Sequence, residues 1–156
     1  MNGVRTQRRR MFLAGIALAL AAAALCCSEK GDPVKASLDR MVKAAHGRDA
    51  QAFADNLAAD FSAAEGMTRA AALDTLKRYF AAYAILDVTL RDVTIERAEK
   101  TARARFTAEL SGQPQKLGGL DAILPRSSAW TFDLRLVPDG SRWKIAWASW
   151  EPADKR

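Results

Sequence analysis

The hydrophobic periodicity of this chain changes once, and that change limits the fold more than any other feature of the sequence. Up to about residue 83, apolar residues recur at helical spacing; beyond it they alternate with polar residues, as in half-buried strands. Helical segments followed by a run of strands indicate an α+β domain, in which the helices cover one face of an antiparallel sheet. We therefore expect three helices and then three or four strands.

Capping residues mark where the helices begin and end. Asp32, followed by a proline, is a typical helix start, and Gly47 ends that first helix. Asp49 can cap a short second helix and Thr68 a third, and residues 60–66 between them are expected to form a bend. The buried face of the third helix would hold Leu73, Leu76, Tyr79, Phe80 and Tyr83.

The strands are indicated by alternation of apolar and polar residues. It is clean from Thr101 to Leu110 and from Trp130 to Leu136, and a preceding strand has an irregularity near Arg91-Asp92. The sequence 138–141 predicts a turn before a last strand at residues 142–150.

The last predicted strand is apolar on both faces. Simple alternation would place Trp143, Ile145 and Trp147 on one face. Ala146, Ala148 and Trp150 would then lie on the other. A sheet with one wet face shows polar residues at every second position, so we expect this strand to be central, with its second face partly covered.

The first residues of the chain are typical of an export signal. Four arginines precede an uncharged apolar run, residues 11–25, that ends in Cys26-Cys27. We expect a lipoprotein signal at 1–26, a polar tether at 27–32, a single domain at 33–152 and a tail at 153–156. Lipoprotein signals resemble a Leu-small-small-Cys box, and neither cysteine fits it fully.

Cys27 is the preferred lipidation site, because Cys26 has the bulky Leu25 directly before it. The alternative is cleavage by the ordinary signal peptidase, which leaves a free cysteine. Ser28 at the second mature position favours the periplasmic face of the outer membrane, and the partner expected there is the membrane itself, through the lipid anchor.

Residues 9–13 also resemble the twin-arginine export motif, through Arg9, Arg10, Phe12 and Leu13. Export through that route moves proteins that have already folded. The alternative is that the arginine pair is only the basic flank that any export signal carries.

Charge and composition exclude several classes of function. The net charge is +6, but four of the 24 basic residues lie in the signal, so the mature part is close to neutral and nucleic acid is not an expected partner. Both cysteines lie at the end of the signal and His46 is the only histidine, so we expect no disulfide, no metal site and no cofactor in the folded domain.

The segment 112–128 is longer than a hairpin needs and contains several leucines. It is expected to pack against the domain, either as a flap over a cavity or as a loop that covers an edge.

Two stretches carry a resemblance to a known family. The helix pair in residues 38–61 and the closing strand in residues 139–147, together with a curved sheet, resemble the nuclear transport factor 2-like superfamily, which includes ketosteroid-isomerase-like and polyketide-cyclase-like proteins. The resemblance covers most of residues 33–150. It implies a cone, in which the sheet wraps around the long helix and leaves a pocket at the wide end.

The resemblance also implies where a site would lie. The pocket residues expected to contact a ligand are Met41, Tyr79, Tyr83, Phe106, Phe132 and Trp147. Isomerase-like members carry a hydrogen-bonding tyrosine where this chain has Met41, which cannot donate. Their catalytic base follows the second helix, and Asp60 and Glu65 are the weak candidates for it here.

Three functions remain open from the sequence. The favoured one is a lipid-anchored, non-catalytic domain that binds a small apolar ligand or an envelope protein. The second is an enzyme of the cyclase, isomerase or hydrolase kind, and the third is an assembly module of the envelope. Because the superfamily often pairs through its outer sheet face, we also expect a weak homodimer, or a bound partner, with Trp150 as the contact.

Overall fold

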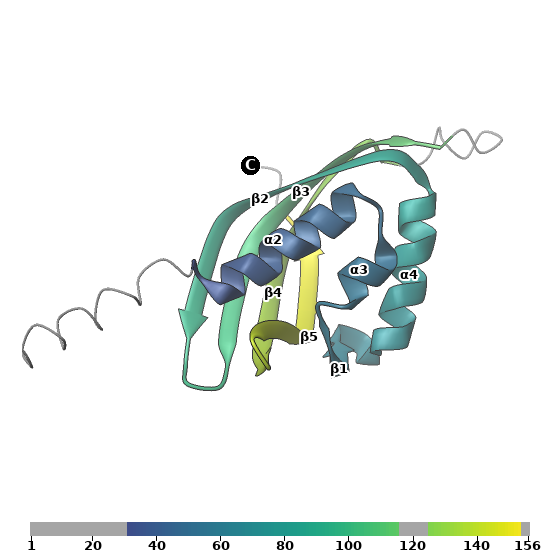
Figure 1. Ribbon diagram of the computed structural model, residues 1–156. Coiled ribbons are helices and arrows are strands. Elements are labelled where there is room, and N and C mark those ends of the chain that lie inside the picture. Colours follow the sequence, from purple (N-terminus) through teal and green to yellow (C-terminus); the bar gives the residue numbers. More distant parts are fainter. Residues whose placement is uncertain (1–30, 116–124, 154–156) are drawn as a thin grey trace, which may run out of the picture. The chain divides into compact units, whose positions relative to one another are not determined.

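The computed structural model describes residues 31–115 and 125–153. Within them the chain forms three helices, a 3-10 turn and one five-stranded sheet (Figure 1). The elements are α2 (Pro33–His46), α3 (Ala50–Ala54), β1 (Leu57–Ala63), η1 (Ala64–Gly66), α4 (Arg69–Ala81), β2 (Tyr83–Arg97), β3 (Ala102–Pro114), β4 (Ser127–Asp139) and β5 (Arg142–Pro152).

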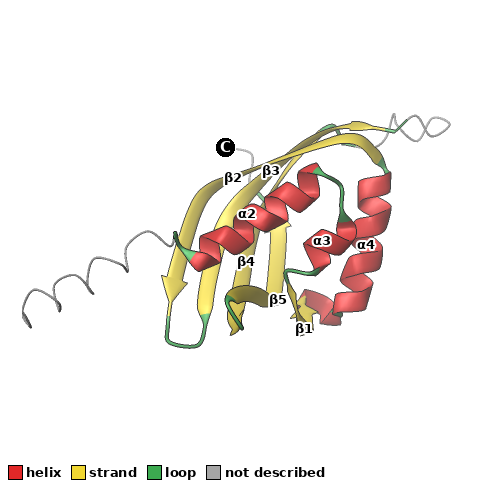
Figure 2. Ribbon diagram, in the orientation of Figure 1, coloured by secondary structure: helices red, strands yellow, loops and turns green. Residues whose placement is uncertain are grey.

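The strand order in the sheet is β1-β5-β4-β3-β2. The four strands β2 to β5 form an antiparallel meander, and β1 adds to β5 in parallel. Figure 2 shows the long strands curving around α2, with α3 and α4 beside it on the same side of the sheet. The expected α+β architecture, a curved sheet packed on three helices, is confirmed.

Strand β1 was not expected from the sequence, where residues 60–66 read as a bend. The pairing of β1 with β5 shifts register between Leu57 and Ser62, so exposed and buried residues do not alternate regularly along it. An irregular strand of seven residues lacks the period of two by which strands are recognised.

The predicted caps are confirmed. The Asp32 carboxylate accepts from the backbone N–H groups of Val34 and Lys35, at 2.8 and 3.0 Å, and its ion pair with Arg97 ties the start of α2 to the end of β2. Asp49 caps α3 through the N–H of Ala52 at 2.9 Å. Thr68 caps α4 and Gly47 follows α2 as its C-cap.

Two predicted irregularities in the strands are also present. Asp92 has a left-handed φ of 54° where the β2–β3 register shifts, and Gly140 has a φ of 59° in the tight β4–β5 turn. A positive φ of this kind is typical of β-bulges and of the tight turns that join two strands.

The simple alternation expected along the last strand is wrong, because β5 contains a bulge. Arg135 pairs with Trp147 and the adjacent Leu136 pairs with Ile145, so Ala146 is an extra residue on β5. A bulge of one residue reverses the faces beyond it. Ile145 and Ala148 are therefore both buried on the helix side, and Trp147 lies on the outer face.

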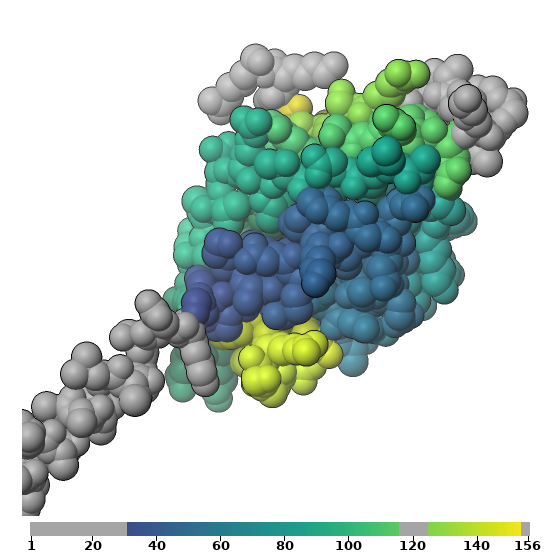
Figure 3. Space-filling model, turned by 45° about the horizontal axis from the view of Figure 1, so that its top comes forward, coloured from purple at the N-terminus to yellow at the C-terminus, as the bar shows by residue number. Residues whose placement is uncertain are grey.

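The helix side of the sheet holds the core. Alternate residues of β3 and β4 meet α2 there, among them Ala104, Leu134 and Leu136, together with Val34 and Leu38 of the helix. All five are at most 2% exposed, and full burial of a leucine-sized side chain contributes about 1.5–3 kcal/mol. Figure 3 shows α2 and α3 (blue) packed against the teal and green strands on that side.

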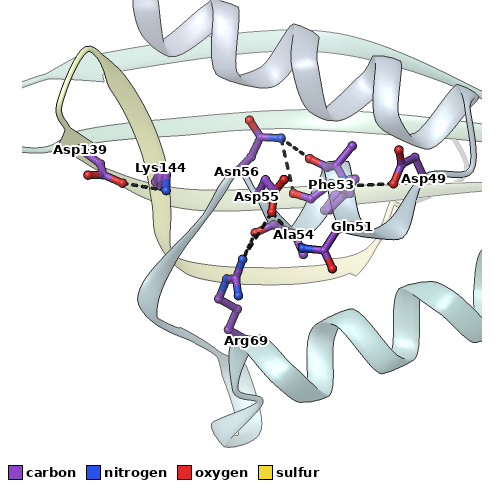
Figure 4. Close-up of polar contacts among 10 residues, drawn as sticks. Asp49, Gln51, Phe53, Ala54, Asp55, Asn56, Arg69, Asp139 and Lys144 are labelled. Atoms are coloured by element: carbon purple, nitrogen blue, oxygen red, sulfur yellow. Dashed lines mark hydrogen bonds and ion pairs between the residues drawn. The ribbon is translucent and has the colours of Figure 1, made fainter.

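A small polar junction joins α2 to β5 and to the end of α3. The Ser37 hydroxyl donates to the backbone oxygen of Trp143 at 2.6 Å, and Arg40 donates to Ser37 and to the Asn56 side chain. Burial, and then the charge of Arg142, lower the pKa of Arg40. Figure 4 shows how Asn56 also holds the end of α3 by donating to the Phe53 backbone.

The predicted export signal with its arginine pair and the lipidation site Cys27 lie outside the described residues, as do most of the tether at 27–32, the middle of the segment 112–128 and most of the tail at 153–156. No helix within residues 31–115 and 125–153 is long and apolar enough to cross a bilayer.

Candidate ligand-binding site

The domain contains a cavity of about 340 Å³ between the helices and the curved sheet. Every helix and strand of the described fold contributes side chains to its wall. Met41 comes from α2, Phe53 from α3 and Phe61 from β1. From α4 and the sheet come Tyr79, Leu90, Phe106, Trp130 and Trp150, among others.

An aromatic row crosses one wall of this cavity. Phe106, Phe132 and Trp150 are direct cross-strand partners on β3, β4 and β5. The two phenylalanine rings stack, with centroids 5.4 Å apart and planes 19° apart, and Trp150 continues the row with its centroid 6.2 Å from that of Phe132. Phe106 is buried, whereas Trp150 is 40% exposed. The row therefore leads from the core towards solvent.

The cavity wall carries no formal charge among the described residues. It includes no Asp, Glu, Lys, Arg or His, and Thr75 and Tyr79 are its hydroxyl-bearing members. A charged group moved into such a space would lose its hydration without gaining a partner, which is costly.

Tyr79 is held in its neutral form. Burial raises its pKa to about 12, with smaller influences from Tyr83, whose ring centroid lies 5.1 Å away, and from the Ser128 side chain. A phenol that keeps its proton is a hydrogen-bond donor throughout the physiological range.

No protein-family model and no curated protein matches this chain significantly. Solved structures do match. Bd1075 of Bdellovibrio bacteriovorus has a TM-score of 0.64 at 13% identity over 79% of this chain, which spans only 40% of that protein. A candidate scytalone dehydratase from Novosphingobium aromaticivorans has a TM-score of 0.68 at 13% identity, with 78% and 83% of the two chains covered.

A candidate dehydratase of the nuclear transport factor 2-like family from Streptomyces avermitilis has a TM-score of 0.67 at 14% identity, with 79% of this chain and 96% of that chain covered. This chain has the nuclear transport factor 2-like fold. The predicted resemblance is thereby confirmed for the fold, which is what similarity at such low identity can show.

Four of the six residues expected to contact a ligand line the cavity of this nuclear transport factor 2-like domain: Met41, Tyr79, Phe106 and Phe132. Alternation along β3 and β4 located the two phenylalanines correctly. The same alternation points to Trp130, which lines the cavity and was not singled out.

Tyr83 and Trp147 do not line the cavity. Tyr83 opens β2 instead of continuing α4, and its buried hydroxyl donates to the backbone oxygen of Pro125 at 2.9 Å. Because of the bulge at Ala146, Trp147 lies on the outer face of the sheet, where the Arg135 guanidinium is 5.6 Å from its ring centroid.

The two carboxylates considered as a catalytic base are both exposed, and neither lines the cavity. Asp60 lies in β1. Glu65 has a left-handed φ of 65° and borders a second hollow, which shares Met67 and Trp150 with the cavity wall. These positions give no support to a base acting on a molecule inside the cavity.

Trp150 lies on the inner face of the sheet. The predicted homodimer contact was expected on the outer face. The outer face, where Trp147 lies, also carries an ion pair between Arg103 and Asp133. The hydrogen bond from Arg103 is the main cause that lowers the pKa of Asp133. The homodimer stays a prediction, and the outer face would have to supply its contacts without Trp150.

His46 lies at the end of α2, as expected, and bridges to β2. Its Nε2 atom lies 3.0 Å from the Asp87 carboxylate and 3.0 Å from the backbone nitrogen of Val88. No group of three or more potential metal-ligating side chains occurs among residues 31–115 and 125–153.

Proposed function

We propose that this protein is a lipid-anchored envelope domain that binds a small apolar molecule in the cavity of its nuclear transport factor 2-like fold. The observation that carries the proposal is the cavity itself: about 340 Å³ with a wall of aliphatic and aromatic side chains. Sites for small molecules are typically concave, largely apolar and about 300–1,000 Å³ in volume.

The uncharged wall favours binding over catalysis. General acid–base chemistry needs a titratable group within hydrogen-bond reach of the reacting atom. Among the described residues, Tyr79 is the one titratable group on the wall, and its raised pKa keeps it protonated near neutral pH, so that it is not available as a base. The candidate dehydratases among the similar structures support an enzymatic alternative, for which the described residues of the cavity wall offer no base.

The anchoring part of the proposal depends on Cys27. A lipidated cysteine there would leave only residues 28–31 before the cap of α2, so the domain would be held close to the outer membrane. Acyl chains bury methylenes at about 0.8 kcal/mol each, which suffices for stable attachment when several chains are present. Mass spectrometry of the mature N-terminal peptide tests this, and acyl groups on Cys26 or an unmodified cysteine would contradict it.

The export route is tested by replacing Arg9 and Arg10 with lysine. This keeps the charge and removes the paired guanidinium groups. Loss of export would identify the twin-arginine route, whereas unchanged export would identify the general route.

Ligand binding is tested by native mass spectrometry of the full-length chain with both cysteines replaced by serine, purified without detergent. A co-purifying small apolar molecule is expected. The matched control is Ala108→Phe, since Ala108 is buried on the cavity wall beside its cross-strand partner Trp130, and a larger side chain there would fill the space. A molecule retained equally by this variant is not bound in the cavity.

A further inference from the structure

Arg40 on α2 and Arg142 at the start of β5 lack a carboxylate partner. Neither side chain takes part in an ion pair within residues 31–115 and 125–153. Other arginines of the described chain do pair with carboxylates: Arg69, Arg91, Arg97, Arg103 and Arg105. The charges of Arg40 and Arg142 are therefore available to a group from outside the domain.

The Arg40 guanidinium is held in place by two buried polar side chains. Its Nε atom donates to Oδ1 of Asn56 at 3.1 Å, and its Nη2 atom donates to the Ser37 hydroxyl at 2.6 Å. Asn56 is 6% exposed and Ser37 is fully buried. A guanidinium has five N–H donors, so three remain for which no partner occurs among the described residues. Arg40 thus presents fixed, unused donors.

The two residues that hold Arg40 also bind the start of β5. Ser37 donates to the backbone oxygen of Trp143 at 2.6 Å, and the backbone oxygen of Asn56 accepts from a β5 N–H group at 2.9 Å. Arg142 directly precedes Trp143 and is exposed. Burial, and then the charge of Arg142, lower the pKa of Arg40. The two guanidinium groups are therefore close enough to repel each other.

The carboxylates nearest in sequence and in strand register are engaged by other cations. Asp39 precedes Arg40 but pairs with a lysine one turn earlier on α2. Asp139 is the cross-strand partner of Arg142, and its carboxylate pairs with Lys144 at 2.7 Å (Figure 4). Lys144 adds a third cation, so the start of β5 and the facing part of α2 carry an excess of positive charge.

A phosphate-type oxyanion matches these donors. Guanidinium groups bind phosphate oxygens through parallel N–H···O bonds, and such charge-assisted bonds are roughly twice as strong as neutral ones. A phosphate group that accepts from both side chains would use the remaining donors of Arg40 and remove the repulsion between Arg40 and Arg142. A carboxylate has only two oxygens, so it would satisfy one guanidinium fork and leave the other unpaired.

We propose that Arg40 and Arg142 form a site for a phosphate group at the junction of α2 and β5. The site is separate from the apolar cavity, whose wall includes neither arginine. The phosphate belongs either to a soluble compound or to a phospholipid headgroup. Arg40 lies about 10 Å along α2 from Pro33, so a lipid anchor at Cys27 would keep the site near the headgroups.

Calorimetric titration with inorganic phosphate, at constant ionic strength, tests the site in the full-length chain with both cysteines replaced by serine. Arg142→Gln should weaken binding about ten- to hundredfold, the effect of losing hydrogen bonds to a charged group. This variant leaves the buried junction of Ser37 and Asn56 intact. Arg40→Lys should also weaken binding, because an ammonium keeps the charge and lacks the fork. Circular dichroism checks that both variants fold.

Lys77→Gln is the matched control, since it removes the same charge from an exposed position on α4. Its affinity for phosphate should equal that of the parent. Absence of binding by the parent, or equal losses in Lys77→Gln and Arg142→Gln, would overturn the proposal. Neither result bears on the apolar cavity, which Ala108→Phe tests separately.

Vesicles of phosphatidylcholine, with and without phosphatidylglycerol, distinguish the two sources of phosphate. Parent and Arg142→Gln are compared, because both carry the same N-terminal segment. Vesicle binding that Arg142→Gln weakens, as it weakens binding of inorganic phosphate, supports the site and identifies a headgroup as its ligand. Equal vesicle binding by both chains, with phosphate binding lost only in Arg142→Gln, supports the site and identifies a soluble phosphate compound.

Discussion

The ring of Tyr83 packs so closely on the backbone of Gly112 that no side chain fits between them. A Cβ atom at position 112 would lie 2.9 Å from Cδ1 of Tyr83 and 2.7 Å from the backbone oxygen of Ile85. This contact joins the start of β2 to the end of β3, and it fixes the ring against which Tyr79 packs. A glycine outside the cavity thus helps to set the position of a residue on its wall.

Gly112→Ala should destabilise the domain by about 1–3 kcal/mol, because the added methyl group overpacks a closed junction. Urea unfolding followed by far-ultraviolet circular dichroism measures the loss. Gly47→Ala is the control, since a Cβ there would be 3.5 Å from its nearest neighbour and the φ of −73° suits any residue. Equal effects of the two substitutions would show that the contact with Tyr83 is unimportant.

Asp32→Ala should cost about 1–2 kcal/mol, because two backbone N–H groups lose their acceptor and Arg97 loses its partner. The comparison is Asp39→Ala on the same helix, where an exposed i,i+4 pair with Lys35 contributes only about 0.3–0.5 kcal/mol. Thermal unfolding of both variants measures the difference, and a smaller loss for Asp32→Ala than for Asp39→Ala would contradict the capping role.

The raised pKa of Tyr79 predicts a loss of stability at high pH. Below pH 10 both the folded and the unfolded chain keep the phenolic proton. Between about pH 10 and the folded value of about 12, the unfolded chain releases it first, so the free energy of unfolding falls as pH rises. The chain has two tyrosines, so ultraviolet titration of the parent and of Tyr79→Phe separates them. Titration of Tyr79 near 10 would show that its hydroxyl is fully solvated.

Trp150→Ala should weaken ligand binding and leave any self-association intact, because the side chain faces the cavity. The expected loss of stability is about 1–2 kcal/mol, below the 3–5 kcal/mol typical of buried tryptophans, since Trp150 is 40% exposed. Light scattering measures the mass of the protein in solution, and native mass spectrometry measures how much ligand the variant retains. If the variant dissociates a dimer and its affinity for ligand is unchanged, Trp150 lies in the dimer interface and the prediction is wrong.

Local signals explain why most of the fold could be predicted. Asp32, Asp49 and Thr68 are capping residues whose effect is confined to one helical turn, so the sequence around each suffices to identify it. Regular alternation along β3 and β4 likewise determines which side chains face the helices, and Phe106 and Phe132 follow from it.

What could not be predicted depends on pairing between distant strands. The bulge at Ala146 is seen only in the pairing of β5 with β4, at a place where β1 pairs with the other side of β5, and nothing in residues 142–150 alone reveals the extra residue. Trp147 was therefore assigned to the cavity and Trp150 to the outer face, the reverse of their positions. Strand β1 was missed for the same reason, since it is defined by its partner more than by its own pattern.

The place of β5 between β1 and β4 has a consequence for when a ligand can be taken up. Parallel pairing with β1 joins residues from the two ends of the domain, and all three α-helices and all five strands of the described fold contribute to the cavity wall. A nascent chain that still lacks β5 has no enclosed space, so capture must follow complete synthesis. A domain that folds before export would then take its ligand from the cytoplasm, and one that folds after crossing the membrane would take it from the envelope. If the protein is exported and binds a ligand as proposed, the translocation route would decide which compartment supplies that ligand.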